Sequence, residues 1–371
     1  MSNTNTDKLF KAFSHKSLLL KNRTVMAPMT RAFSPGNLPS PEVAGYYRRR
    51  AEGDVGLIIT EGTFISHKAA NGYENIPAFF GEKALAGWQH VVDEVHAAGG
   101  QIIPQIWHVG SVRKLGTGPD KTVPAYSPSG LYKPGAKNGV AMTQADIDEV
   151  VASFAQAARD AKSIGFDGVE VHGAHGYLVD QFFWEGTNQR EDKYGGSLEN
   201  RARFGVEIVE AIRAVVGEEF SIVFRFSQWK QQDYNAKLCQ TPEELAIFLS
   251  LLSDAGVDIF HASTRRFWQS EFEGSDLNLA GWTKKLTNKP VITVGNIGLD
   301  TDFIGEGNKD LSGTSNPTGI DELLSRLNND EFDLVAIGRA LLVDPQWVNK
   351  IRDKAIDEIK PFSKKSLMSL S

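Results

Sequence analysis

Two histidines and a tyrosine stand close together at the end of a short apolar run, in the segment Gly168–Tyr177 (GVEVHGAHGY). His172 and His175 are three residues apart, a spacing that would place both imidazoles on one face of a helical turn. Two imidazole N–H groups can donate to one oxygen that gains negative charge, and the Tyr177 phenol can supply a proton nearby. Such a set is suited to adding hydride and a proton across a C=C bond conjugated to a carbonyl group.

A metal site is the alternative for the same residues. His172 and His175, together with His108 or His261, could bind a metal ion as in metal-dependent barrel hydrolases. The first apolar run ends in Pro-Met-Thr at positions 28–30, with no His-x-His pair and no nearby aspartate. The sequence therefore favours proton chemistry without a metal, and the hydrolase remains the alternative.

Two further apolar runs carry Gln105 and Arg225. An amide and a buried cation match the pyrimidine edge of a flavin, because the cation stabilises the negative charge of the reduced ring. The structural alternative is an ion pair inside the protein, for example between Arg225 and Glu61, since a buried arginine is rarely left unpaired. These two residues alone do not separate the alternatives.

The last two apolar runs end in Gly295-Asn296 and Gly338-Arg339. In barrels of alternating strands and helices, this corner commonly binds a phosphate through backbone N–H groups. Glycine lets the backbone approach the ligand, and an arginine adds a forked donor. The glycines could instead be simple turn residues and Arg339 a surface charge. Because both runs end alike, we favour a phosphate site, and with it a flavin beside Gln105 and Arg225.

Aromatic residues flank the same positions. Trp107 lies two residues after Gln105, so both side chains should point to the same side of a strand and face one cavity. Tyr73 and Trp268 are assigned to the substrate pocket with it, Trp268 without a specific argument. Trp229 is interpreted as packing.

Eight short runs rich in β-branched residues must position these groups, and helical patterns lie between them. The runs cover residues 24–29, 55–60, 101–107, 168–172, 221–226, 257–262, 290–295 and 333–337. Helical patterns cover 83–98, 145–164, 197–210, 320–327 and 346–356, and another begins at Thr241-Pro242. This alternation predicts an α/β fold, a closed (β/α)8 TIM barrel. An open doubly wound sheet is less favoured, because its Gly-x-Gly-x-x-Gly turn is absent.

Several segments lie outside this pattern. Residues 1–20 should cover the barrel bottom with apolar side chains. Residues 109–142 form a long loop after the third strand, rich in glycine, proline and serine, on the face that carries the active site in such barrels. Residues 298–319 form a second, polar insertion, and 359–371 a C-terminal tail. We expect residues 1–371 to form one domain.

Composition indicates a cytoplasmic protein without nucleic-acid or membrane partners. The net charge is −6 and 41% of the 371 residues are hydrophobic, as in ordinary globular enzymes. The single cysteine, Cys239, excludes an internal disulfide and fits a reducing compartment. The N-terminal MSNTNTDKLF lacks the apolar segment of a signal peptide.

The motifs together resemble the old yellow enzyme family of FMN-dependent ene-reductases, from Leu9 to about Trp347. They are VMAPMTR (25–31), ITEG (59–62), PQIWH (104–108), GVEVHGAHGYL (168–178), DKYGGSLENR (192–201) and IGR (337–339). The resemblance implies FMN as cofactor and NADPH or NADH as transient reductant, in a ping-pong reaction. Its substrates would be small α,β-unsaturated carbonyl or nitro compounds, and the protein would be a monomer or homodimer.

The resemblance also implies a role for each matching residue. Pro28, Met29 and Gly62 would line the flavin and Thr30 would bind its O4, while Gln105 and Arg225 would hold the pyrimidine edge and Gly295, Asn296, Gly338 and Arg339 the phosphate. His172 and His175 would bind the substrate oxygen, Tyr177 would protonate Cα, and Tyr73, Trp107 and Trp268 would shape the pocket. Thr30 places the chain with the threonine members, and His175 stands where many members have asparagine. The segment 188–192 is assigned a structural role.

Overall fold

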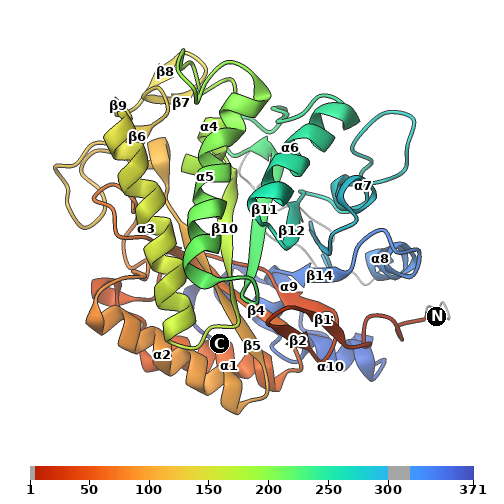
Figure 1. Cartoon of the computed structure of the whole chain (residues 1–371). Helices are drawn as coiled ribbons and strands as arrows, with labels where there is room; N and C mark the ends of the chain where they lie inside the picture. Colours follow the sequence, from red (N-terminus) through yellow and green to blue (C-terminus); the bar gives the residue numbers. More distant parts are fainter. Residues whose placement is uncertain (1–4, 300–317) are drawn as a thin grey trace.

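Eight parallel strands form a closed barrel in the computed structural model, which describes residues 5–299 and 318–371 (Figure 1). In order around the barrel they are β3 (Thr24–Met26), β4 (Leu57–Phe64), β5 (Gln101–Trp107), β10 (Gly168–His175), β11 (Ser221–Lys230), β12 (Ile259–Ser263), β13 (Val291–Val294) and β14 (Leu334–Ile337). Each predicted run overlaps one of them, and β4, β10, β11 and β12 extend beyond the predicted ends. β14 pairs with β3 and closes the cylinder. The predicted (β/α)8 barrel is confirmed.

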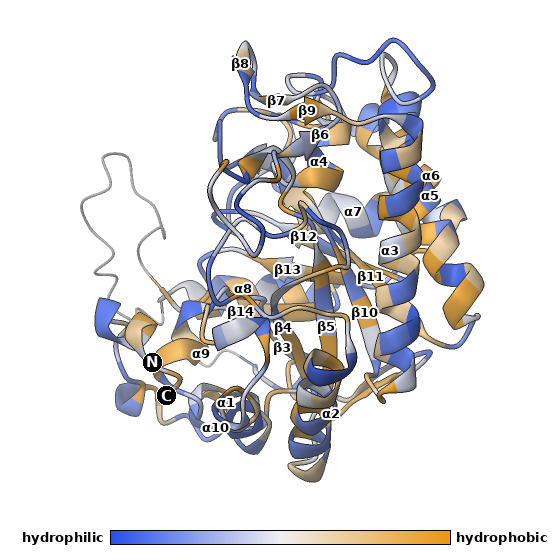
Figure 2. Cartoon of the chain, turned by 90° about the vertical axis from the view of Figure 1, so that its left-hand side faces the viewer, coloured by the Kyte–Doolittle hydropathy of each residue, from blue (hydrophilic) through white to orange (hydrophobic). Residues whose placement is uncertain are grey.

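Helices surround the barrel. The larger ones are α1 (Pro41–Glu52), α2 (Glu82–Ala97), α3 (Gln144–Ser163), α5 (Leu198–Val216), α6 (Pro242–Ala255), α7 (Leu279–Thr287) and α8 (Thr318–Asn328), and the short ones are α4 (Leu178–Phe183), α9 (Arg339–Val343) and α10 (Trp347–Arg352). The outer helices alternate hydrophilic and hydrophobic residues along their length, as amphipathic helices do (Figure 2). The sequence patterns did not include α7.

Side-chain caps begin several of these helices where the sequence carries the matching residue. The Thr143 hydroxyl accepts from the Asp146 N–H at 3.2 Å, and the Asp146 carboxylate accepts from the Thr143 N–H at 2.8 Å. At the start of α6 the Thr241 hydroxyl accepts from the Glu244 N–H at 3.3 Å, and Pro242 is at the first helical position. Such caps satisfy N–H groups that have no partner within the helix, so they fix where each helix begins.

A hairpin covers the bottom of the barrel. Its strands, β1 (Phe13–His15) and β2 (Leu18–Leu20), pair antiparallel and lie at the end away from β6–β9 in Figure 1. Phe13, Leu18 and Leu20 join the cluster of buried residues inside the barrel, which includes Leu57 and Ile259. The predicted N-terminal cover is therefore present. Burying these side chains removes apolar surface from water and completes the packed core inside the barrel.

The long loop after β5 is present as well and contains small sheets. β6 (Tyr126–Ser127) pairs with β9 (Val140–Ala141), and β7 (Leu131–Lys133) pairs with β8 (Ala136–Lys137). We call residues 109–142 the cap segment, because they lie over the upper end of the barrel (Figure 1).

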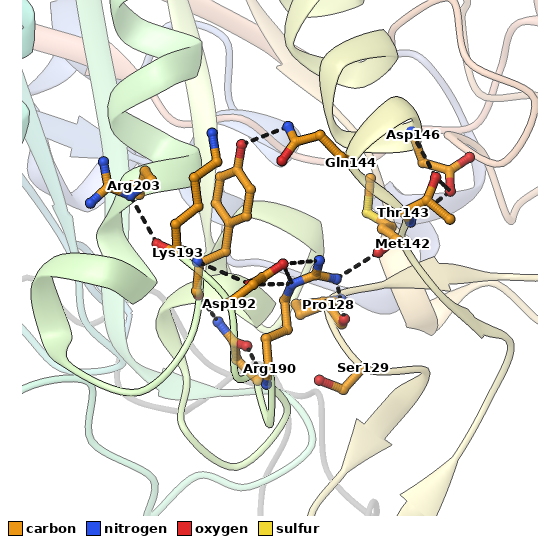
Figure 3. Close-up of polar contacts among 12 residues, drawn as sticks. Pro128, Ser129, Met142, Thr143, Gln144, Asp146, Arg190, Asp192, Lys193 and Arg203 are labelled. Atoms are coloured by element: carbon orange, nitrogen blue, oxygen red, sulfur yellow. Dashed lines mark hydrogen bonds and ion pairs between the residues drawn. The ribbon is translucent and has the colours of Figure 1, made fainter.

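Arg190 fastens the cap segment to the loop between α4 and α5 (Figure 3). Its Nη1 donates to the carbonyl oxygens of Pro128 at 2.9 Å and Met142 at 2.6 Å. Its Nε donates to Asp192 at 3.0 Å, and the neighbouring Gln189 N–H donates to the Ser129 hydroxyl at 2.8 Å. The segment 188–192 thus has the structural role expected from the sequence.

The C-terminal segment returns to the barrel. Residues 364–368 form a short 3-10 helix, and Arg31 donates from Nη2 to the carbonyl oxygens of Ser366 and Leu367 at 3.2 Å and of Ser369 at 2.8 Å. Most of the predicted polar insertion at 298–319 lies outside the described residues. In the described part of the chain, no helix is long and apolar enough to cross a membrane.

Candidate active site

A cavity of about 380 Å³ opens at the carboxyl ends of the barrel strands. The predicted residues that line it are Pro28, Met29, Thr30, Gly62, Gln105, Trp107, His172, His175, Tyr177, Arg225, Gly295, Asn296, Gly338 and Arg339. Residues that the sequence did not assign to the site also line it, among them Trp229, Tyr234, Ser263, Arg265 and Leu367. One cavity thus contains the residues expected for the flavin, the phosphate and the proton chemistry.

The two histidines meet in a way that the sequence did not predict. The segment is not a helical turn: β10 continues to His175, and its pairing with β11 shifts register between Gly173 and His175. His175 has a φ of +64° and Gly176 one of +76°. This irregularity turns both imidazoles to one side, with ring centroids 5.2 Å apart at 88°. The expectation of a shared face was right, but its helical explanation was wrong.

Buried polar contacts hold this turn. The Gly176 N–H donates to Asp180 Oδ2 at 2.7 Å, and Asp180 Oδ1 accepts from Lys230 Nζ at 2.6 Å. Both side chains of this ion pair are fully buried. The His175 N–H donates to the Ser227 hydroxyl at 2.9 Å. An isolated charge would be costly here, so removing either partner of the pair should distort the turn.

Both imidazoles are neutral. Burial lowers the pKa of His172 and of His175 well below the usual value, and the positive charge of Arg225 lowers it further. The Ala174 N–H donates to His172 Nδ1 at 3.4 Å, so the proton of His172 is on Nε2. His172 can therefore donate one hydrogen bond into the cavity.

Tyr177 keeps its proton. Burial raises the pKa of its phenol well above 10, and the neighbouring Tyr73 raises it further. Its ring packs edge-on against His172 at 5.1 Å and Trp107 at 4.8 Å. A protonated phenol thus lies beside the imidazole donor, as an acid in this reaction must.

Gln105 and Arg225, on the two strands that flank β10, line the same cavity, and Gln105 binds a buried carboxylate. Gln105 Nε2 donates to Glu170 Oε1 at 2.7 Å, and the other oxygen of Glu170 contacts His261 Nδ1 at 2.6 Å. Arg225 donates from Nη2 to Ser263 at 3.1 Å, and its buried Nε has no hydrogen-bond partner in the described part of the chain. A ligand acceptor would satisfy that atom.

The pairing of Arg225 with Glu61, given as an example of the structural alternative, is not formed. Glu61 does not pair with Arg225; its Oε2 accepts from the N–H groups of Arg31 and Ala32 at 2.9 and 3.0 Å. Glu61 therefore holds the loop that follows β3 and contains Thr30. Burial raises the pKa of Glu61 from its ordinary 4.5 to about 7.

Glu61→Gln should change how stability depends on pH. The folded protein holds the Glu61 proton more tightly than the unfolded chain, so the group's contribution to stability is present below pH 4.5 and is lost as pH rises to about 7. Glutamine can accept the same two N–H bonds without ionising. The variant should gain about 3 kcal/mol relative to the original protein between pH 4 and pH 8, measured by denaturant unfolding. The exposed Glu52→Gln is the control, and a pH-independent difference for Glu61→Gln would contradict the prediction.

At the expected phosphate corner, two glycines leave the backbone without side chains. Gly295 has a φ of +154°, and a Cβ on it would lie 2.4 Å from Thr264 Oγ1. Asn296 has a φ of +56°, and its Oδ1 accepts from Arg339 Nη2. Gly338 precedes α9, and a Cβ there would meet only Met29, at 3.6 Å. These residues fit a phosphate group bound by main-chain N–H groups and an arginine.

The aromatic residues divide differently from the expectation. Trp107 lines the cavity, and Tyr73 stacks on it with centroids 5.8 Å apart. Neither Tyr73 nor Trp268 is among the residues that line the cavity, and Trp268 packs edge-on against Phe267 at 5.2 Å. Trp229, expected to be packing, lines the cavity and stacks on His175 at 4.5 Å.

His108 and His261, the further ligands of the metal alternative, contact other side chains. His261 is bound to Glu170, and His108 contacts His67 at 2.8 Å. Within residues 5–299 and 318–371, no three histidine, cysteine or acidic side chains are grouped so that they could hold a metal ion. The arrangement offers neutral and cationic hydrogen-bond donors around one cavity, which fits FMN.

A (β/α)8 barrel with these groups at its mouth defines a flavin-dependent oxidoreductase. Comparison with known proteins agrees: the sequence profile of the NADH:flavin oxidoreductase / NADH oxidase family matches residues 8–315. The chain belongs to this family.

Relatives cover most of the chain. The "Putative 12-oxophytodienoate reductase 11" of Oryza sativa subsp. japonica is 35% identical over 341 residues, covering 84% of this chain and 90% of that protein. The NADH oxidase of Thermoanaerobacter brockii is 33% identical over 368 residues, covering 96% of this chain; the chain spans only 52% of that longer protein.

Solved structures share the fold. Morphinone reductase in complex with tetrahydroNAD superposes with a TM-score of 0.81 at 30% identity, covering 97% of this chain and 93% of that one. The old yellow enzyme homologue from Zymomonas mobilis gives 0.80 at 25% identity, covering 97% and 96%. The predicted old yellow enzyme family is confirmed. The protein is an FMN-dependent oxidoreductase that uses NADH or NADPH, with the predicted ene-reductase function, and nothing favours the hydrolase.

Proposed function

We propose that His172, His175 and Tyr177 carry the ene-reductase chemistry at the mouth of the barrel. The observation that supports this division of roles is the meeting of two neutral imidazoles and a protonated phenol in the cavity that contains Gln105 and Arg225. The imidazoles bind the carbonyl or nitro oxygen of the substrate. Tyr177 protonates the carbon next to that group.

When bound, FMN supplies the hydride transfer, from the nicotinamide to the β-carbon of the substrate. As hydride arrives, the substrate oxygen gains negative charge, and the N–H groups of His172 and His175 stabilise it more strongly than in the ground state. Tyr177 then completes the addition by giving its proton to the α-carbon. Trp107 stacks on His172 with centroids 6.0 Å apart, and the two rings form one wall of the cavity.

The cofactor contacts follow the lining of the cavity. Thr30 binds the flavin O4, and Pro28, Met29 and Gly62 line its ring. Gln105 and Arg225 bind the pyrimidine edge, where the Arg225 charge favours the anionic reduced ring. The phosphate is bound by Gly295, Asn296, Gly338 and Arg339. A Cβ on Gly62 would come within 2.6 Å of Trp107, so this position is as tightly packed as a flavin-lining residue should be.

One cavity serves both ligands in turn. NADH or NADPH binds first, leaves, and is replaced by a small enone or nitro compound, which gives ping-pong kinetics. The buried Cys239 and the net charge of −6 support a reducing, cytoplasmic location without nucleic-acid partners. We propose a monomer or homodimer.

A phenol titration tests this assignment. The purified protein should be yellow, and a simple para-substituted phenol should produce a long-wavelength charge-transfer band. The band is expected because two neutral N–H donors stabilise a phenolate stacked on the oxidised flavin. A yellow protein that gives no band would contradict the paired-donor site, and a colourless protein with stoichiometric zinc would point to the hydrolase.

A further inference from the structure

We propose that Ser263, the last residue of β12, is a positioning residue that sets which ring nitrogen of His175 carries the proton. It thereby directs an N–H of His175 at the substrate oxygen. This inference rests on the proposed function of His175 as an oxygen-binding residue. It adds a residue from a different strand, which acts through His175 and makes no contact of its own with the reacting atoms of the substrate.

The Ser263 hydroxyl joins two functional side chains. Its Oγ lies 3.1 Å from Arg225 Nη2 and 2.8 Å from His175 Nε2. The residue is 2% exposed and lines the same cavity as both partners. One buried hydroxyl thus connects the cation expected at the flavin edge with the imidazole expected at the substrate oxygen.

The donor and acceptor groups of the three side chains determine the direction of each hydrogen bond. A guanidinium group can only donate, so Oγ of Ser263 accepts from Arg225. Among residues 5–299 and 318–371, the hydroxyl hydrogen then has one neighbour able to accept it, Nε2 of His175. If Nε2 carried the proton instead, the hydroxyl hydrogen would have no acceptor in the described part of the chain, which is costly for a buried group.

The directions of these two hydrogen bonds determine the tautomer of His175. Because Nε2 accepts from Ser263 and the ring is neutral, its only N–H is at Nδ1. Within the described residues, Nδ1 takes part in no hydrogen bond, and His175 lines the cavity. His172 presents Nε2–H, so the two rings each offer one N–H, from different ring positions.

The ring of His175 cannot rotate freely to exchange its nitrogens. Trp229 stacks on one face, with centroids 4.5 Å apart and planes at 23°. The indole N–H of Trp229 in turn donates to the Ser263 carbonyl oxygen at 3.2 Å. Ser263 therefore holds the ring with its side chain and holds the stacking partner with its main chain.

Phenol binding to the holoprotein tests the role. Ser263→Ala should bind a para-substituted phenol about 3- to 10-fold more weakly, as expected for one lost hydrogen bond, with FMN still bound. Ser263→Thr keeps the hydroxyl and should stay within about 2-fold of the original protein. Ser221→Ala is the matched control: it removes a buried hydroxyl, bonded to Ser17 and His15, at the opposite end of the neighbouring strand. Unchanged phenol affinity in Ser263→Ala would overturn the proposal.

A second measurement needs no variant of Ser263. Nitrogen-15 NMR of histidine-labelled holoprotein should show His175 protonated at Nδ1, its signals assigned by their absence in His175→Asn. Protonation at Nε2 would overturn the proposal even if Ser263→Ala failed to fold. Failure of the proposed function looks different: the original protein itself would then give no charge-transfer band with phenol.

Discussion

Replacing Tyr177 with phenylalanine is expected to slow the reaction with an enone by about 10²- to 10⁴-fold, the usual contribution of a positioned acid. Reduction of the protein by NADPH or NADH should stay within a few-fold, because that step needs no proton from the phenol. The structure supports this separation, since the Tyr177 phenol is protonated and lies beside His172, whose imidazole we propose as a donor to the substrate oxygen. If a water molecule partly replaces the phenol as the acid, we expect the slowing to be near about 10²-fold.

Anaerobic stopped-flow spectroscopy measures the two half-reactions separately. The control is Tyr194→Phe, which removes a tyrosine hydroxyl that donates to Glu207 at 2.8 Å, outside the cavity lining. This variant should leave both half-reactions unchanged. Equal slowing of both half-reactions in Tyr177→Phe would remove the acid role and indicate general damage to the site.

Gly295→Ala is expected to weaken FMN binding by about 100-fold, so that the protein is purified largely without flavin. Gly295 has a φ of +154°, which side chains disfavour, and an added Cβ would lie 2.4 Å from Thr264 Oγ1 and 2.9 Å from the Phe267 nitrogen. The backbone after β13 must therefore move, and its N–H groups would no longer match a phosphate.

Gly81→Ala separates backbone strain from loss of the cofactor site. Gly81 also has a positive φ, of +79°, but a Cβ there would meet nothing within 4 Å. This variant should lose some stability and keep stoichiometric FMN. The measurements are the flavin-to-protein ratio and a fluorescence titration of FMN into each protein. Full flavin content and unchanged affinity in Gly295→Ala would contradict the phosphate assignment.

Much of the barrel could be predicted because buried parallel strands read as short apolar runs, and the helices between them carry periodic patterns and caps. The strand ends were less predictable. β4 and β11 continue to Phe64 and Lys230, beyond the predicted 60 and 226, because pairing with neighbouring strands extends them. The two- and three-residue strands of the cap segment are too short to produce any periodicity.

The site could be predicted where residues lie at strand ends, because the barrel brings all those ends together. The helical explanation of the histidine pair failed since a register shift in a strand can produce the same shared face. The position of Trp268, outside the cavity lining, depends on a loop and could not be predicted. Ser263 and Leu367 could not be assigned roles, as their contacts join segments distant in sequence: Arg31, for example, binds the Leu367 carbonyl oxygen.

Arg190 holds the cap segment only through main-chain oxygens, those of Pro128 and Met142. Such an anchor does not depend on which side chains lie between these two positions. Residues 130–141 can therefore change in sequence, by drift or by design, while the two Arg190 contacts stay in place; Ser129 is also bound through its side chain, by the Gln189 N–H. Because no residue of the cap segment lines the cavity, this part of the protein can behave as an exchangeable cassette that changes separately from the flavin chemistry.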